Sequence, residues 1–249
     1  MTDLSHSPPA IKSILVALML AIFLGALDQT IVAVSMPAIS AQFNDVDRLA
    51  WVISGYMVAM TVATPIYGKL GDLYGRRRMI LIGTGLFTVA SLFCGMAQSM
   101  EQLVLARLLQ GVGAGGMVSV SQAIIGDVVP PRERGRYQGY FSSMYAAASV
   151  LGPVLGGYMT QYLSWRWVFL INLPLGAFAC WYANRKLAGL PIPQRTPVID
   201  YLGTVLMIIG LSTLLMSITR IGQGHGLGDT QVWGLLVVAV VALLGFVWH

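Results

Sequence analysis

Residues 14–39 read ILVALMLAIFLGALDQTIVAVSMPAI, and Asp28 is the only ionisable side chain among them. A bilayer-spanning helix needs about 20 predominantly apolar residues, so this stretch predicts a membrane helix. An unpaired charge inside hydrocarbon costs several kcal/mol, roughly 3 on insertion scales. Because so costly a residue usually marks a proton, ion or substrate site, we predict that Asp28 is functional. The alternative is a static ion pair that only holds the structure together.

The composition of the whole chain also indicates a membrane protein. Of its 249 residues 56% are hydrophobic and 10% are charged, and the mean hydropathy is +0.73, whereas a soluble domain is about 25% charged. The net charge of +5 is attributed to cytoplasmic loops and not to a nucleic-acid partner. We therefore predict an all-α polytopic membrane protein, with spans at residues 13–36, 50–69, 79–98, 102–127, 138–162, 167–186, 201–220 and 231–249.

The distribution of Lys and Arg predicts the orientation of these spans. Cytoplasmic loops carry an excess of basic residues, and a cytoplasmic N-terminus places eleven on that side against three on the other. The eleven are Lys12, Lys69, Arg76, Arg77, Arg78, Arg132, Arg134, Arg136, Arg185, Lys186 and Arg195; the three are Arg48, Arg166 and Arg220. Residues 1–12 are then a short cytoplasmic tail, in which Pro8 and Pro9 argue against a helix, and residues 187–200 are a cytoplasmic linker.

Sequence features of enzymes and metal sites are missing. Cys94 and Cys180 lie inside predicted spans without a CxxC or Cys/His pattern, so we interpret them as small core residues. The glycines at 111–116 lie in mid-span and not after a soluble strand, and there is no Walker A pattern. We predict that the chain is not an enzyme and needs no cofactor or metal.

Five segments carry a resemblance to a known family. The loop GKLGDLYGRRR at residues 68–78 resembles the signature loop of the major facilitator superfamily, which lies between its second and third helices. Four other segments are similar to motifs of that family: LDQTIVAVSMP at 27–37, LVLARLLQGVGAG at 103–115, GPVLGG at 152–157 and WRWVFLINLP at 165–174. The segments at 27–37 and 165–174 are similar to motifs of its fourteen-helix drug:proton antiporter branch.

The resemblance implies both an architecture and a function. Residues 13–186 would form the N-terminal six-helix bundle and residues 201–249 two linking transmembrane helices, in a chain that stops at His249 before the second bundle. The implied function is proton-coupled efflux of small hydrophobic or cationic compounds, such as drugs, across the bacterial plasma (inner) membrane. The implied partners are protons, a small-molecule substrate, the lipid bilayer and the C-terminal bundle of the same polypeptide. The alternatives are export of a specific metabolite or siderophore, and a truncated membrane interaction module that transports nothing.

Asp28 and Arg107 are the predicted proton-coupling pair. Counted along their spans at 1.5 Å per residue, both lie about 10 Å below the outer surface. We therefore expect them to face a shared, water-accessible cavity. Burial favours the neutral form of Asp28 and a nearby guanidinium favours its carboxylate, so protonation could switch the balance.

Charged residues at the cytoplasmic face suggest a conformational latch. Asp72 and Arg76 are four residues apart, and Asp127 reaches the same side from the end of span four. By analogy with the family these three would form a network, with Gly68 and Gly75 permitting tight turns. The alternative is that the charges are solvated and serve only to set the topology.

Two further groups of residues are candidates for gating and for substrate contact. Gly152, Pro153, Gly156 and Gly157 in span five are predicted to form the bent, close-packed seam of the antiporter motif; a passive kink is the alternative. The aromatic and methionine residues Tyr56, Met57, Met144 and Tyr145, together with Asn172, are candidates for a substrate cavity, although such apolar positions more often face lipid or the core. Trp165, Arg166 and Trp167 are predicted to anchor the outer boundary.

Overall fold

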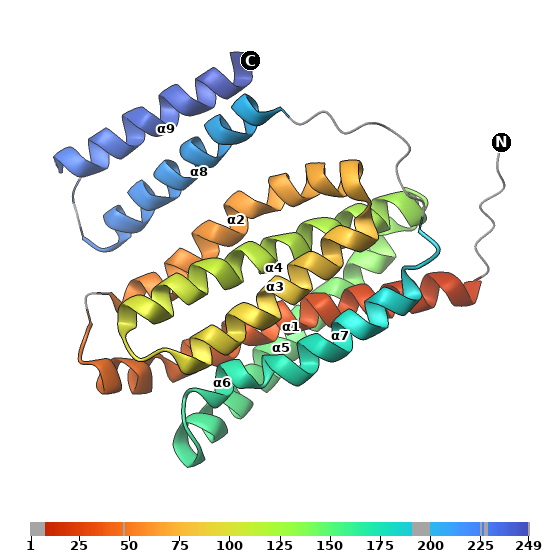
Figure 1. Cartoon of the computed structure of the whole chain (residues 1–249), viewed down its shortest axis with the longest axis horizontal. Coiled ribbons are helices and arrows are strands. Elements are labelled where there is room, and N and C mark those ends of the chain that lie inside the picture. Colours follow the sequence, from red (N-terminus) through yellow and green to blue (C-terminus); the bar gives the residue numbers. More distant parts are fainter. Residues whose placement is uncertain (1–7, 47, 191–199, 225, 227–228, 249) are drawn as a thin grey trace.

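In a computed structural model, which describes residues 8–46, 48–190, 200–224, 226 and 229–248, the chain is a bundle of long helices with a separate helical pair beside it (Figure 1). Helices α1 to α7 run back and forth as the bundle, and α8 and α9 lie together along its α2 side. The elements are α1 (Pro8–Phe43), α2 (Leu49–Tyr74), α3 (Arg76–Met96), α4 (Met100–Val128), α5 (Arg134–Tyr162), α6 (Trp167–Leu170), α7 (Asn172–Lys186), α8 (Tyr201–Gly222) and α9 (Thr230–Trp248).

The structure is that of a multi-pass membrane protein. Among the described residues, α1, α2, α3, α4, α8 and α9 are each long and apolar enough to cross a bilayer. Helix α5 has 29 residues but is less apolar, and α7 has only 15. Both pack within the bundle, and with α6 they occupy the fifth and sixth spans that the sequence predicts, without being both as long and as apolar as the other six helices.

The first helix is longer at both ends than predicted. It starts at Pro8, so the prediction of a non-helical tail is wrong for residues 8–12; residues 1–7 lie outside the described part. Proline is tolerated in the first turn of a helix, where backbone N–H groups have no partner within the helix. The helix also continues through Pro37 to Phe43. Asp28 therefore lies 15 residues, about 22 Å, from the C-terminal end of α1, much nearer the middle of the helix than predicted.

The sixth predicted span is broken into two helices. Helix α6 ends at Leu170 and α7 begins at Asn172, with Ile171 in a turn between them. Pro174 explains the break, because its ring crowds the carbonyl group of Leu170 and it has no N–H to donate. Together residues 167–186 still extend about 30 Å, which is enough to cross the hydrocarbon core.

Glycines in α4 allow three helices to pack closely. A Cβ at Gly115 would lie 2.5 Å from the backbone oxygen of Met60 in α2, and one at Gly111 would collide with the oxygen of Tyr56. On another side of α4, a Cβ at Gly113 would lie 2.5 Å from the backbone nitrogen of Phe87 in α3. Such contacts between backbones stabilise helix pairs in lipid, where the hydrophobic effect does not.

Trp165 does not anchor the protein in the membrane interface. Its side chain is only 3% exposed, and its indole N–H donates to Oε1 of Gln42 at 2.5 Å, so the prediction is wrong for this residue. Trp167 is half exposed. Arg166 also donates to Gln42, at 3.1 Å, and to the backbone oxygen of Ala97, at 2.9 Å. This segment therefore connects the ends of α1 and α3.

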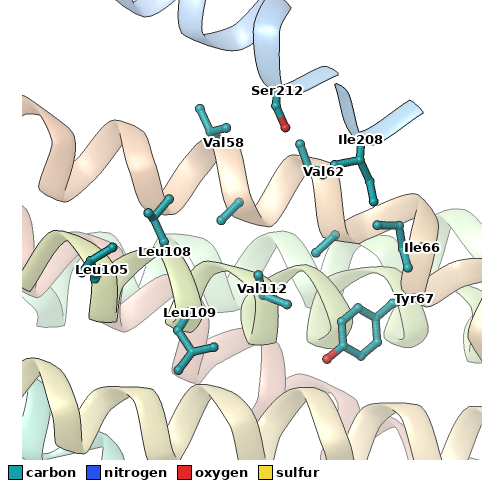
Figure 2. A pocket seen from close by; sticks show the side chains of 12 residues that line it. Val58, Val62, Ile66, Tyr67, Leu105, Leu108, Leu109, Val112, Ile208 and Ser212 are labelled. Carbon is teal, nitrogen blue, oxygen red and sulfur yellow. The ribbon is translucent and has the colours of Figure 1, made fainter. Parts of the chain in front are cut away.

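An apolar groove separates the α8–α9 pair from the bundle. Figure 2 shows it between α2, α4 and α8, and its volume is about 570 Å³. Its wall is almost entirely aliphatic, with Tyr67 and Ser212 supplying the hydroxyl groups. The residues that line it include none of the predicted site residues; they are Val58, Ala59, Val62, Ala63, Ile66, Tyr67, Leu105, Leu108, Leu109, Val112, Ile208 and Ser212.

Candidate functional site

The structure brings Asp28 and Arg107 into direct contact inside the bundle. Nη1 of Arg107, on α4, donates to Oδ2 of Asp28, on α1, at 2.5 Å. The two residues are 79 positions apart, yet their side chains are 1% and 0% exposed. Breaking a buried pair of this kind by removing one partner costs about 3–5 kcal/mol, because a charge is left uncompensated.

Two amide side chains complete the surroundings of the Asp28 carboxylate. Nε2 of Gln110 and Nδ2 of Asn172 both donate to its Oδ1, at 2.9 and 2.7 Å. The same two nitrogens donate to the hydroxyl of Ser91, at 2.7 and 3.3 Å. Helices α1, α3, α4 and α7 thus meet at one buried polar cluster, which we call the Asp28 cluster: Asp28, Ser91, Arg107, Gln110 and Asn172.

The arginine of this cluster is held by neutral groups as well. Its Nε donates to the backbone oxygen of Val52 in α2 at 3.1 Å, and its Nη1 donates to Oε1 of Gln110 at 2.7 Å. The guanidinium lies over the ring of Tyr56, with 4.0 Å between its central carbon and the ring centroid. Contact with an aromatic face stabilises a cation, more strongly where water is excluded.

This geometry fits an ionised Asp28. The groups that donate to its oxygens are all N–H donors, and an ionised carboxylate offers acceptors at both oxygens. Protonation of Asp28 would remove the charge that compensates Arg107 while leaving the arginine charged. An ionised Asp28 therefore leaves the cluster electrically balanced inside the closed bundle, whereas a neutral Asp28 would not.

Among the described residues, Asp28 and Arg107 are enclosed by other side chains and do not face the water-accessible cavity that the sequence predicts. Both charged groups are buried, because Gln110, Asn172 and Tyr56 fill the space around them. A small cavity of about 10 Å³ lies near Tyr56 and Gln29, and Tyr145 also lines it. That volume is about enough for one water molecule.

The predicted substrate-cavity residues do not form one wall. Tyr56 is buried against Arg107, and Asn172 belongs to the Asp28 cluster, so the structure gives both a place other than an open cavity. Met57 and Tyr145 are exposed, and Met144 packs against the core. Of the five, Tyr56 and Tyr145 share the small cavity.

The five residues predicted for the cytoplasmic network come together. Arg76 makes ion pairs with Asp72 and with Asp127, the latter at 3.1 Å between Nε and Oδ2. Its Nη1 donates to the backbone oxygen of Gly68 at 3.1 Å. Gly75 joins α2 to α3 with φ of 95°, a conformation that favours glycine. The ends of α2, α3 and α4 are thus linked through one arginine.

The four residues of the antiporter motif face two directions. Gly152 and Gly156 pack against α1, where a Cβ at Gly156 would lie 2.9 Å from the backbone oxygen of Ile31. The hydroxyl of Thr30 donates across this contact to the backbone oxygen of Ala148 at 2.9 Å. Pro153 is exposed, and a Cβ at Gly157 would meet no atom within 4 Å of the part described. The motif thus joins α5 to α1 and presents a second, open face.

Sequence reasoning missed several members of the buried site. Gln110 lies three residues after Arg107, one helical turn on, and that spacing was a usable signal for a shared face. Ser91 gave no such signal, since serine is common in membrane spans. Both cysteines are free. Cys94 does not only fill space in the core, because its thiol donates a hydrogen bond to Oε1 of Gln110 at 3.4 Å.

The fold and the buried Asp28–Arg107 pair place this chain among polytopic membrane proteins that have a polar core. The sequence model of the Major Facilitator Superfamily matches residues 18–249, and the chain belongs to that family. It is 37% identical over 235 residues to multidrug resistance protein 3 of Bacillus subtilis, covering 94% of this chain and 46% of that protein. The multidrug transporter MdtP of the same organism is also 37% identical, with 94% and 43% covered.

Other relatives and solved structures extend this comparison. A vacuolar membrane amino acid uptake transporter of Schizosaccharomyces pombe is 36% identical, with 97% of this chain and 43% of that protein covered. The human organic anion transporter MFSD10 has a similar fold, with a TM-score of 0.66, 18% identity, and 87% of this chain and 61% of that chain covered. The chain thus spans about half the length of the curated relatives that it matches.

Proposed function

We propose that this chain is the proton-coupling half of an efflux antiporter, which exports small hydrophobic or cationic compounds in exchange for protons. The observation that carries the proposal is the buried ion pair between Asp28 and Arg107. Ionisable residues within membrane spans commonly mark proton relays and transport pathways. The multidrug transporters among the relatives support the class of cargo.

The proposed cycle follows from the two electrostatic states of the Asp28 cluster. With Asp28 ionised, the pair is neutral overall and the bundle closes around it. A proton arriving from the outer side neutralises Asp28 and leaves Arg107 unpaired in a dry interior. That state favours a rearrangement that gives the arginine water, and release of the proton to the cytoplasm restores the pair. Alternating access between two bundles couples this step to export.

Two other parts of the structure support the cycle. The Arg76 network ties α2, α3 and α4 at one end, and we assign to it a latch for one conformation. The exposed face of α5 around Pro153 and Gly157 is apolar, since Val150 and Val154 are about two-thirds exposed. We assign that face to contact with a second bundle of the same polypeptide, within the bacterial inner membrane and with the N-terminus cytoplasmic.

One comparison favours a second candidate for the cargo. The amino acid uptake transporter is as similar to this chain as the multidrug transporters are. Export of a specific metabolite is therefore the competing function, and a panel of drugs and amino acids tested in vesicles separates the two.

The decisive experiment replaces Asp28 with Asn in the protein expressed from its complete reading frame. Efflux from vesicles is measured with and without a pH gradient, with Glu133→Gln as a control because Glu133 lies in a cytoplasmic loop. The proposal predicts that Asp28→Asn abolishes acceleration by the gradient and that the control keeps it. Undiminished coupling in Asp28→Asn would remove the proton-carrier role.

A simpler observation tests the interaction-module alternative. If the reading frame continues past His249 with about six further spans, transport by two bundles is favoured. An in-frame stop directly after His249 favours a module that does not transport by itself.

A further inference from the structure

The side chain of Asn172 has one unused hydrogen-bonding atom next to the ion pair. Its Nδ2 donates to Asp28 and to Ser91, which uses both of its hydrogens. Its Oδ1 is buried and has no hydrogen-bond partner among the described residues. A buried carbonyl without a partner costs about 1–3 kcal/mol, so its retention needs an explanation.

The other amide of the cluster has no such spare atom. Gln110 donates to Asp28 and Ser91 through Nε2, and its Oε1 accepts from Arg107 and Cys94. Turning the Gln110 amide around would place its nitrogen against the guanidinium, so Gln110 is fixed. Asn172 can turn around without losing an acceptor contact, because its oxygen makes none.

We propose that Asn172 is a positioning residue that hydrogen-bonds to Asp28 in both of its protonation states. It does so by rotating its side-chain amide, which exchanges the positions of its oxygen and nitrogen. In the ionised state Nδ2 donates to the carboxylate, as the structure shows. When Asp28 is protonated on Oδ1, the Asn172 oxygen takes the place of the nitrogen and accepts the new O–H. The inference rests on the proposed function, since it requires that Asp28 gains and loses a proton.

The chemistry of this step is simple. A hydronium ion gives one proton to Oδ1 of Asp28, so that one of its O–H bonds breaks, one O–H bond forms on Asp28 and water is left; the same proton returns to water when the carboxylate re-forms. The amide gives up the two bonds that Nδ2 donates, to Asp28 and to Ser91, and its oxygen accepts the O–H of Asp28 in their place. Without such an acceptor, a protonated Asp28 would point its O–H at the N–H donors of Gln110 and Asn172, which is repulsive.

The other titratable groups around Asp28 do not supply an unused hydrogen-bond acceptor in contact with its carboxyl group. Arg107 from α4 has only donors. Tyr56 from α2 contacts the guanidinium with its ring, and its hydroxyl, also buried without a partner among the described residues, is not hydrogen-bonded to Asp28. Cys94 from α3 is directed at Gln110, and Tyr145 from α5 lines the small cavity with Tyr56. Asn172 is the group in direct contact with Asp28 that holds an unused acceptor.

The chain is well suited to a direct test by magnetic resonance, because its asparagines are few. They occur at 44, 172 and 184, and of these Asn172 is the buried one. Asn44 neighbours Asp45 and has φ of 50°, which glycine adopts readily, so Asn44→Gly removes its signal. The chain is labelled with ¹⁵N in asparagine and ¹³C in the aspartate carboxyl groups, in lipid bilayers, and titrated with acid.

The expected result is that the side-chain amide signals of Asn172 shift with the same midpoint as the carboxyl signal of Asp28, while those of exposed Asn184 stay constant. In Asp28→Asn the shift of Asn172 is lost. If the Asp28 carboxyl titrates and the Asn172 amide does not follow, the inference is overturned while the proposed function stands. If Asp28 never titrates, the proposed function fails first.

A second measurement uses two substitutions of Asn172, so that the inference can still be tested if one variant fails to fold. Asn172→Leu removes the donor and the acceptor together, and Asn172→Ser keeps one of each on a hydroxyl that can rotate. We expect the pH profile of efflux by the complete protein to change in Asn172→Leu and to be largely restored in Asn172→Ser. Equal profiles in both variants and the wild type would contradict a positioning role.

Discussion

At the scale of single residues, the protein is organised around a charge that its environment has to accommodate. Asp28 has three N–H donors, from Arg107, Gln110 and Asn172, in place of water. Desolvating two charges costs several kcal/mol per ion, and only good geometry with further hydrogen bonds offsets that cost. The cluster meets this condition, and it is therefore sensitive to the loss of either charge.

A double-mutant cycle measures that sensitivity. Arg107→Met removes the cation, and we expect it to destabilise the chain by about 3–5 kcal/mol because Asp28 is left buried and unpaired. Asp28→Asn should cost a similar amount for the converse reason. The double variant should be less destabilised than the sum of the two, as judged by thermal unfolding in detergent. Additive effects would show that the two side chains are not energetically coupled.

The sequence predicted the two charged residues of the site but not the way in which they are accommodated. Asp28 and Arg107 stand out because charges in apolar spans are rare. The amides around them do not, because Gln110 and Asn172 carry no charge and their contacts join residues up to 144 positions apart. The depth of Asp28 was also misjudged, since α1 continues to Phe43 and does not end near residue 36.

At the scale of the elements, glycine determines how closely the helices approach. Gly111 and Gly115 face α2, and Gly113 faces α3, so α4 is in backbone contact with two neighbours. Hydropathy predicts that these helices exist, whereas the small residues at four-residue spacing indicate only that they pack. The break at Ile171 shows the same limit, because hydropathy predicts residues 167–186 as one span and does not reveal the interruption between α6 and α7.

Two glycines of α4 allow this packing to be tested with a matched control. A Cβ at Gly113 would lie 2.5 and 2.7 Å from backbone atoms of Phe87 and Gly83, so Gly113→Ala must push α3 away. We expect a loss of about 1–3 kcal/mol in thermal unfolding. At Gly126 a Cβ would meet nothing within 4 Å, so Gly126→Ala should be neutral or stabilising by up to about 1 kcal/mol. Equal effects of the two substitutions would contradict this account of the packing.

The turn between α1 and α2 should respond to acid. The backbone N–H of Arg48 donates to Asp45, and the Arg48 guanidinium does so at 2.8 Å; these bonds hold the pKa of Asp45 below its usual range. The pKa of Asp45 is lower in the folded state than in the unfolded state, where it is about 3.9, so the ionised carboxylate stabilises the turn above that pH. This stabilisation is lost as the pH falls through the folded-state pKa. The protection factors of the amides of residues 44–46 and 48–50, which correct the exchange rates for the intrinsic effect of pH, should therefore fall below about pH 4.

Asp45→Asn is the control for that prediction. It removes the titrating group, so the protection factors in the turn should be lower at neutral pH and nearly independent of acid. If the variant kept the acid response of the wild type, another group would have to be responsible, and the exposed ion pair between Arg48 and Glu101 is the neighbouring candidate.

At the scale of the whole molecule, the chain divides into a bundle with its own core and a helical pair beside it. Both buried clusters of apolar side chains consist of residues from 14 to 187 in the described part. Helices α8 and α9 pack mainly against each other and meet the bundle along α2, across the groove of Figure 2. The sequence predicted these two helices as spans but gave no sign of where they would lie, since their outer faces are uniformly apolar.

This arrangement predicts that the bundle folds without the pair. A chain ending at Leu190 keeps the Asp28 cluster, the Arg76 network and both apolar cores, so we expect its midpoint of thermal unfolding to change by no more than about 4 °C, the effect of about 1 kcal/mol. A chain beginning at Leu49 is the matched control: it lacks α1 and leaves Arg107 buried without Asp28, and it should fail to form a stable bundle. Circular dichroism and gel filtration in detergent separate the outcomes. If removing α8 and α9 unfolded the remaining helices, the bundle would depend on a contact across the groove, and the independence inferred from the two cores would be wrong.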